Sequence, residues 1–146
     1  MKHFKYIICI MLLGLFSCSS QKKLQTETPF ELGSATCQAY IGGMENSGNG
    51  LSIKIPVTID EASTLEMKEI YFRGKQASIT MEQIDGANYA IAKIPNSKGG
   101  SAETIALALE ATEAVLSYTE NGKLKYTKVT GIKEKQPLLY KGKPKN

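Results

Sequence analysis

Residues 113–129 read EAVLSYTENGKLKYTKV, and this stretch predicts the fold more clearly than any other part of the chain. Asn121 followed by Gly122 accepts the two positive φ angles of a type I′ turn, whose twist matches that of a β-hairpin. Counting back from the turn pairs Glu120 with Lys123, Tyr118 with Lys125, Leu116 with Thr127 and Ala114 with Val129. That face is polar at the tip and apolar further in, as expected for a hairpin that enters a hydrophobic core.

The chain on either side of this hairpin consists of short segments of alternating apolar and polar residues, separated by glycine, asparagine and proline. A second turn is expected at residues 73–75. This pattern predicts an all-β fold, a single antiparallel β-sandwich of immunoglobulin-like type with about seven or eight short strands, within residues 30–131. The expected strands are residues 34–43, 51–59, 67–73, 76–83, 88–94, 104–109, 113–120 and 123–130.

Residues 101–116 allow two interpretations. Their alanine, leucine and glutamate residues have good helix propensity, and Ser101 could cap a helix. Ile105, Leu107 and Leu109 alternate, however, whereas a helix would place apolar residues three and four apart. We therefore expect two strands around a turn at residues 110–112, with a helix as the alternative.

The N-terminus has the layout of a signal peptide. Lys2 and Lys5 precede an apolar run over residues 6–16, and small residues follow it. A run of this length covers only about half of a ~30 Å hydrocarbon core, so it is too short for a membrane-spanning helix. We expect residues 1–17 to be removed. An ordinary secretory signal is the alternative to the lipoprotein signal described next.

Residues 15–18, LFSC, resemble the lipobox of bacterial lipoproteins, although Phe16 is bulkier than the usual residue at its position. The resemblance implies that the Cys18 thiol receives a diacylglyceryl group and that Cys18 becomes the acylated first residue. Two or three acyl chains, such as palmitate, would make membrane anchoring effectively permanent. The polar residues 18–29 are expected to form a flexible tether after the lipid.

The charge of the chain is concentrated at its C-terminal end. The whole chain carries a net charge of +4, but residues 122–146 contain eight lysines and only one acidic residue, Glu134. We assign residues 132–146 to a basic tail that could contact an anionic membrane surface or an acidic polymer. A simple solvated end explains the lysines equally. Nucleic acid is not an expected partner of an exported chain.

The residue types present exclude several kinds of chemistry. Beyond the leader the chain has no histidine, so it cannot form a Ser-His-Asp or Cys-His site, and it lacks the ligands of a zinc site. Cys37 is alone and alternates with polar neighbours, which predicts that it faces the core. Asp60, Glu61 and Asp85 lack the spacing of a calcium loop. We predict no catalytic residue, no metal and no cofactor.

The best aromatic and basic cluster for recognition contains Tyr71, Arg73 and Lys75, and the predicted hairpin adds Lys123 and Lys125. Arg73 can bind a carboxylate or phosphate with two parallel hydrogen bonds. A hairpin with one apolar face explains the same residues without a ligand.

Three segments resemble short lipoproteins of Flavobacteria and related Bacteroidota: residues 29–43 (PFELGSATCQAYIGG), residues 70–75 (IYFRGK), and residues 113–129 continuing to IKEKQPLLY. The resemblance covers nearly the whole chain after the leader, and it implies a compartment, the cell envelope, but no activity. Ser19 is not the aspartate that retains lipoproteins in the inner membrane, and no acidic cluster of the surface-export type follows Cys18. These features imply the periplasmic face of the outer membrane.

Together these observations predict a lipid-anchored envelope protein that acts as a non-enzymatic binding or accessory module for an envelope protein partner. One alternative is binding of a small ligand or acidic polymer through the lysine-rich C-terminal end. Another is a small hydrolase that works with two carboxylates, although the absence of tryptophan removes the usual sugar-stacking platform.

Overall fold

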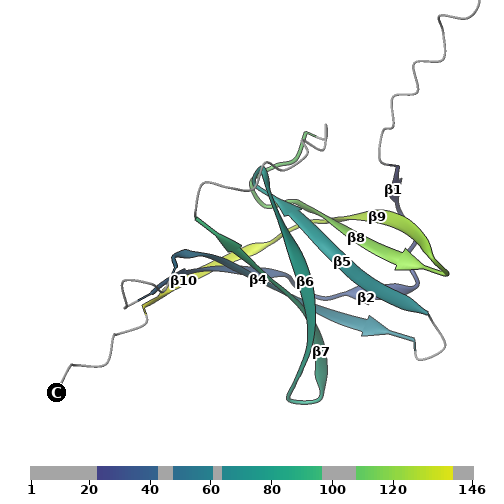
Figure 1. Cartoon of the computed structure of the whole chain (residues 1–146), viewed down its shortest axis with the longest axis horizontal. Coiled ribbons are helices and arrows are strands. Elements are labelled where there is room, and N and C mark those ends of the chain that lie inside the picture. The colour runs from purple at the N-terminus through teal and green to yellow at the C-terminus, as the bar shows by residue number, and fades with distance from the viewer. Residues whose placement is uncertain (1–22, 43–47, 61–63, 97–107, 140–146) are drawn as a thin grey trace, which may run out of the picture.

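The computed structural model of the protein describes residues 23–42, 48–60, 64–96 and 108–139, and all of its regular elements are strands (Figure 1). The predicted signal peptide and Cys18 lie outside the described residues. The strands are β1 (Leu24–Gln25), β2 (Phe30–Leu32), β3 (Thr36–Ile41), β4 (Gly50–Ile59), β5 (Leu65–Phe72), β6 (Lys75–Ile84), β7 (Ala87–Pro95), β8 (Ala114–Glu120), β9 (Lys123–Val129) and β10 (Lys133–Leu139).

The strands form one mixed sheet along the path β1-β9-β8-β5-β6-β7-β4-β3-β10, and β2 pairs with the far end of β4. The prediction of an all-β fold is confirmed. The prediction of a purely antiparallel sandwich is corrected in two respects. The path is continuous rather than divided into two sheets, and its two outermost pairs, β1 with β9 and β3 with β10, are parallel.

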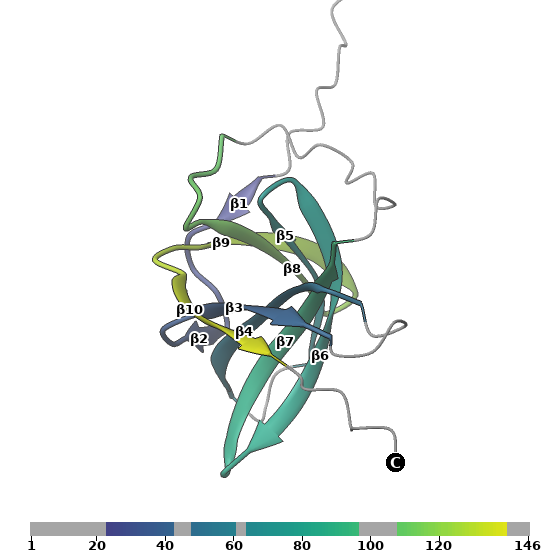
Figure 2. The same ribbon diagram turned by 90° about the vertical axis from the view of Figure 1, so that its left-hand side faces the viewer.

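The strand that joins the two halves of the sheet is β6. Its residues 75–78 pair with β5, whereas its residues 79–84 pair with β7. In Figure 2 the half with β8 and β9 lies above the half with β3, β4 and β10. A period-two pattern reports which face of a strand is buried, but it does not report where along its length the strand changes partners. This explains why the sequence predicted two sheets where the structure has one.

The hydrophobic core lies between the two halves and draws on both of them. Phe30 of β2 meets Tyr118 of β8 edge to face, with the ring centroids 4.8 Å apart. Such contacts are favourable beyond their buried area. Burial also raises the pKa of the Tyr118 phenol, whose hydroxyl has no hydrogen-bond partner in the part of the chain that the structure describes. The other large, fully buried side chains are Ile53, Ile55, Ile70, Phe72, Ile94, Val115 and Leu116.

The predicted register of the β8–β9 hairpin is confirmed at all four pairs. Three hairpins turn on the same backbone geometry, in which a non-glycine residue with positive φ precedes a glycine with positive φ. The pairs are Arg73–Gly74, Asp85–Gly86 and Asn121–Gly122. These are the dihedral signs of a type I′ turn, so the predicted turn after Phe72 is confirmed as well.

Strand β5 contains a β-bulge that the sequence analysis did not predict. The register with β8 shifts between Met67, opposite Tyr118, and Glu69, opposite Ser117. The Ser117 hydroxyl bridges the irregularity, since it accepts from the Glu69 amide at 3.1 Å and donates to the Glu69 carbonyl at 3.3 Å. The extra residue changes the alternation, so that Met67 and Ile70 both reach the core.

Two expectations for the chain between β7 and β8 have different outcomes. A turn at residues 110–112 is confirmed, because the Glu113 amide donates to the Glu110 carbonyl at 3.0 Å. The strand predicted for residues 104–109 is wrong where it can be compared, since residues 108–109 are not in a strand. The choice between strand and helix for residues 101–107 lies outside the described residues.

Both segments predicted to be outside the folded domain contribute strands to it. Within the expected tether, β1 pairs with β9, and the Thr127 hydroxyl donates to the Gln25 carbonyl at 3.1 Å. Within the expected basic tail, β10 pairs with β3, and Ile132 just before it is buried. The boundaries predicted near residues 30 and 131 therefore do not limit the fold, which extends at least from Leu24 to Leu139.

Candidate anion-binding face

The five residues predicted as a recognition surface are not brought together. Tyr71, Arg73 and Lys75 lie around the β5–β6 turn, and Lys123 and Lys125 lie at the β8–β9 turn. Strand β8 runs antiparallel to β5, so these two turns are at opposite ends of the pair. The length of β8 separates them, which is roughly 20 Å. They cannot bind one small ligand together.

Arg73 binds a carboxylate, as its chemistry predicts, but the carboxylate is in the same chain. Its Nη2 lies 3.0 Å from Oε2 of Glu134 in β10, and its Nε donates to the Ala111 carbonyl at 3.1 Å. The guanidinium carbon is also 4.7 Å from the centroid of the Phe72 ring. Arg73 therefore connects the β5–β6 turn to the 108–113 loop and to the edge strand β10.

Two other predicted recognition residues have partners within the chain. Tyr71 is buried, and its hydroxyl donates to Oε2 of Glu69 at 3.1 Å. Lys125 pairs with Glu120 across the hairpin, and this hydrogen bond raises the pKa of Lys125. Lys123 is exposed and Lys75 is half-buried, and no ion pair links either of them to another described residue.

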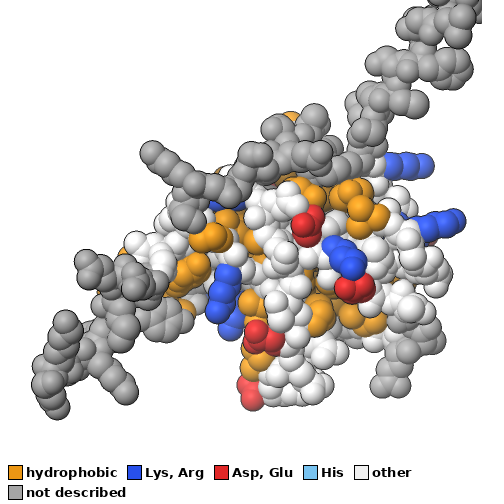
Figure 3. All heavy atoms as spheres, in the orientation of Figure 1, with side chains coloured by type: hydrophobic (Ala, Val, Ile, Leu, Met, Phe, Trp, Pro, Cys, Tyr) orange, Lys and Arg blue, Asp and Glu red, His pale blue; other side chains and the backbone are white. Residues whose placement is uncertain are grey.

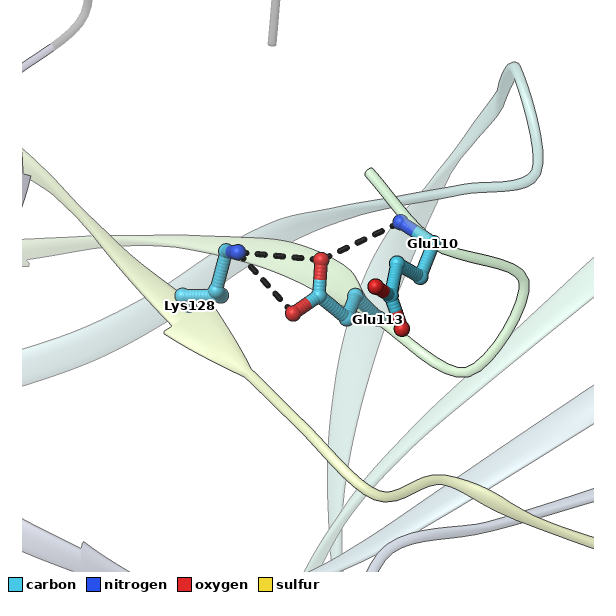
Figure 4. A network of polar contacts seen from close by, with 3 residues as sticks. All are labelled: Glu110, Glu113 and Lys128. Atoms are coloured by element: carbon cyan, nitrogen blue, oxygen red, sulfur yellow. Dashed lines mark hydrogen bonds and ion pairs between the residues drawn. The ribbon is translucent and has the colours of Figure 1, made fainter. Parts of the chain in front are cut away.

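Glu113 organises the loop before β8 (Figure 4). Its Oε2 accepts from the Glu110 amide at 3.1 Å, while its own amide donates back to the Glu110 carbonyl. Lys128 of β9 donates to both carboxylate oxygens at 2.9 Å. The Lys128 hydrogen bond, helped by the Glu110 amide, holds the pKa of Glu113 below its usual value. The Glu113 carboxylate therefore links the backbone of the loop before β8 to Lys128 of β9.

The lowered pKa of Glu113 makes a prediction about stability and pH. A carboxyl group whose pKa is lower in the folded chain stabilises the fold above its unfolded pKa, and this contribution is lost as the pH falls toward the folded pKa. We expect Glu113→Gln to reduce the free energy of unfolding at neutral pH, and the deficit to shrink below about pH 4.5, the ordinary value for this group. Urea unfolding of the wild type and of Glu113→Gln at neutral and acidic pH measures this deficit.

The control for this measurement is Glu66→Gln, which removes an exposed carboxylate that pairs only with the neighbouring Lys68. A deficit for Glu113→Gln that stayed constant down to strongly acidic pH would show that the ionised carboxylate is not what holds the loop.

Cys37 faces the core, as predicted, and is almost fully buried. Burial raises the pKa of its thiol, with Arg73 acting in the opposite direction. A thiol with a raised pKa is mostly protonated at neutral pH and is a poor nucleophile. Its environment fits a packing role.

The structure creates a basic surface that the sequence analysis did not predict, on the outer side of β10, β3, β4 and β7. Lys54 lies between Ile53 and Ile55, which are buried, so the alternation directs the lysine outward. The same argument applies to Lys93, between Ala92 and Ile94. The register brings in two further exposed lysines from β10. We call Lys54, Lys93, Lys133 and Lys135 the basic face.

The four lysines form two adjacent rows across the sheet. In one row Lys133 lies opposite Thr36, and Thr36 lies opposite Lys54. In the other row Lys135, Gln38, Ser52 and Lys93 follow one another across four strands. Strand spacing places Lys133 and Lys54 about 10 Å apart at their Cα atoms, and the rows about 7 Å apart. Lysines with hydroxyl and amide groups between them can bind anionic groups spaced by several ångströms.

The charge of the basic face is not balanced by nearby carboxylates. Strands β3, β4, β7 and β10 contain one acidic residue, Glu134, which lies opposite Cys37 and pairs with Arg73. No ion pair links any lysine of the basic face to another described residue. The face seen in Figure 3, over β5 and β8, differs, because basic and acidic side chains lie next to each other there.

An apolar edge borders the basic face where β3 and β10 end. Ile41 and Leu139 pair there and are 43% and 70% exposed, and Leu138 beside Tyr40 is 46% exposed. Sequence reasoning missed this edge because it treated residues 132–146 as an unpaired tail. The signal that could have revealed Lys54 is its outward position in the alternation of LSIKIPVTI.

Nothing in the described residues points to a metal site or a membrane-spanning helix. The described residues contain no group of three or more histidine, cysteine, aspartate or glutamate residues that could hold a metal ion. No helix in that part of the chain is long and apolar enough to cross a bilayer. A comparison with models of known protein families and one with curated proteins gave no match.

Proposed function

We propose that this chain is a lipid-anchored protein of the cell envelope and a non-enzymatic binding module that holds an anionic partner on its basic face. The observation that carries the proposal is the placement of Lys54, Lys93, Lys133 and Lys135 on one side of four adjacent strands without a carboxylate among them. The anchor is expected at Cys18, on the periplasmic side of the outer membrane.

The physical argument for anion binding is electrostatic. Lysines that no described carboxylate pairs with exchange water and counterions for an anion, which is favourable at low salt and weakens as salt screens the charges. A lipid anchor would add to this effect, since it confines the module near partners held at the same membrane and raises their effective concentration. The partner we expect is an envelope protein with an extended acidic segment.

An acidic polymer is the second candidate. It is favoured by the repeated arrangement of the basic face, where two rows about 7 Å apart can bind successive charges of a regular chain. This candidate also agrees with the anion-binding role predicted for the lysine-rich C-terminal end, because Lys133 and Lys135 belong to the basic face.

The test compares two double variants that remove the same charge. We expect Lys54→Gln/Lys133→Gln to weaken binding of a fluorescent polyglutamate peptide at low salt by about tenfold, because each lysine near an anionic surface contributes up to ~1 kcal/mol and a tenfold change corresponds to about 1.4 kcal/mol. The control, Lys75→Gln/Lys123→Gln, should change the affinity by less than about twofold. Fluorescence anisotropy at two salt concentrations measures both.

Equal losses from the two double variants would contradict the proposal, because they would show a response to net charge and not to one face. A parallel titration with dextran sulfate separates the two partner classes. Tighter binding of dextran sulfate than of polyglutamate at equal charge favours the acidic polymer, and the reverse order favours the acidic protein segment.

A further inference from the structure

The pairing of β1 with β9 shortens the connection between the lipid and the folded domain. A free tether over residues 18–29 would allow the domain roughly 40 Å of movement from the membrane. In the structure, Leu24 lies opposite Tyr126 and Gln25 opposite Thr127, so the fold begins at β1. Only four residues then lie between Cys18 and Lys23, and the five steps from one Cα atom to the other span at most roughly 17 Å in an extended chain.

This geometry decides which part of the domain is nearest the bilayer. Because β1 is parallel to β9, the chain enters the sheet from the side of the β8–β9 turn. The last residues of β10 lie at the other end of the molecule along its longest axis (Figure 1). A domain held by residue 23 therefore turns its β1/β9 edge toward the membrane and the end of β10 away from it.

The side chains on that edge have the composition of a membrane-interface surface. Leu24 and Tyr126 share the outer side of the β1–β9 pair, and Leu124 lies on the same side of β9 and is 54% exposed. Lys23 and Lys123 precede Leu24 and Leu124 in the chain and are exposed, and the alternation directs them to the other side of the same edge. We call these five residues the β1/β9 strip. Leucine enters the acyl boundary, tyrosine favours the headgroup level, and lysines extend toward lipid phosphates.

We propose that the β1/β9 strip docks on the anionic headgroups of the membrane that holds the lipid anchor. The pairing of β1 with β9 keeps the strip close to that membrane. This inference rests on the proposed lipidation of Cys18. It predicts a fixed orientation, in which the domain lies on its β1/β9 edge and the end of β10 points into the aqueous compartment.

The experiment uses the full, lipidated protein in phosphatidylethanolamine vesicles with or without phosphatidylglycerol. A polarity-sensitive fluorophore is placed at Leu124→Cys or, as the matched control, at Leu139→Cys. Both sites are exposed leucines, while Cys37 is buried and Cys18 carries the lipid. Nitroxide-labelled headgroups should quench the probe at residue 124 several-fold more than the probe at residue 139. Phosphatidylglycerol should increase this difference.

Three variants test the causes separately. Lys23→Gln/Lys123→Gln should remove the effect of phosphatidylglycerol, whereas Lys133→Gln/Lys135→Gln should leave it in place. Leu24→Pro/Gln25→Pro, which removes both backbone N–H donors of β1, should bring the quenching at residue 124 down to that at residue 139 while circular dichroism stays unchanged. Equal quenching at both sites in the unmodified background would overturn the docking proposal, as would stronger quenching at residue 139.

Flotation with the vesicles distinguishes failure of the docking proposal from failure of the proposed lipid anchor. A protein that floats but shows equal quenching is anchored without docking, which rejects the inference alone. A protein that does not float lacks the anchor, which rejects both.

Discussion

Cys18→Ser should move the protein from the membrane fraction to the soluble fraction and abolish its labelling with radioactive palmitate. The hydroxyl of serine does not replace the thiolate as the group that accepts diacylglycerol. Each buried methylene stabilises membrane binding by ~0.8 kcal/mol, so the two or three acyl chains that we propose would hold the wild type effectively permanently. The apolar leader run over residues 6–16 is too short to substitute as a spanning helix. Cell fractionation and fatty-acid labelling measure the two effects.

The matched control is Cys37→Ala, which removes the other thiol that remains after the leader. Because Cys37 is buried in the core and is a poor nucleophile, this variant should remain in the membrane fraction and keep its label. The lipoprotein assignment would be wrong if Cys18→Ser stayed in the membrane and the wild type took up no label. An ordinary secretory signal would instead release both proteins as soluble material.

The parts of the fold that could be predicted from the sequence are those fixed by local chemistry. The Asn121–Gly122 turn sets its own dihedral angles, and two-residue loops leave one register for the flanking strands, so all four predicted pairs of the β8–β9 hairpin are present. The burial of Cys37 followed in the same way from the alternation around it.

The parts that could not be predicted depend on contacts between distant segments. Strands β1 and β10 each join the sheet by parallel pairing, β1 with a partner about a hundred residues away. The sequence around β1 is polar and β10 is lysine-rich, and such compositions resemble those of a tether and a tail. Strand β10 is exposed on every residue and contains Pro137 beside a register shift, as expected for an edge strand that is protected from further pairing.

In the candidate site, too, local sequence patterns were informative only for single residues, and the grouping of residues depended on contacts between distant segments. Neighbours in sequence, such as Tyr71 and Arg73, were proposed together, but one is buried and the other is bound to Glu134. The basic face joins Lys54 and Lys133, which are far apart in sequence and meet only through the register of β3 with both of its neighbours. A lysine in an alternating strand signals an outward face, but the neighbours of that face are set by strand order.

Gly50→Ala should destabilise the protein severely, and the reason lies in the packing around the start of β4. Gly50 lies between Tyr40 of β3 and Pro95 of β7. A Cβ atom added there would lie 2.5 Å from the Tyr40 hydroxyl oxygen and closer still to the Ile94 carbonyl oxygen. The carbonyl belongs to the backbone of a paired strand, so relief requires the sheet itself to move.

Two effects of this substitution oppose each other, and their sizes decide the outcome. Replacing glycine by alanine within a strand is ordinarily favourable by about 0.5–1 kcal/mol, because the unfolded chain loses freedom. Forcing an extra carbon into a packed site costs about 1–3 kcal/mol or more, and here one of the clashing atoms is main chain. We expect the upper end of this cost, and therefore a net loss of about 2 kcal/mol in the free energy of unfolding, a large share of the ~5–15 kcal/mol typical of a domain.

Urea unfolding of Gly50→Ala beside Gly48→Ala provides the measurement and its control. An added Cβ at Gly48 meets no atom within 4 Å, so that variant should remain within about 0.5 kcal/mol of wild type. Adding Tyr40→Ala to Gly50→Ala removes the side-chain clash and leaves the Ile94 carbonyl, so it should not restore wild-type stability. If Gly50→Ala matched Gly48→Ala, the close approach of β3 and β7 to Gly50 would be wrong, and with it the order β7-β4-β3 that assembles the basic face.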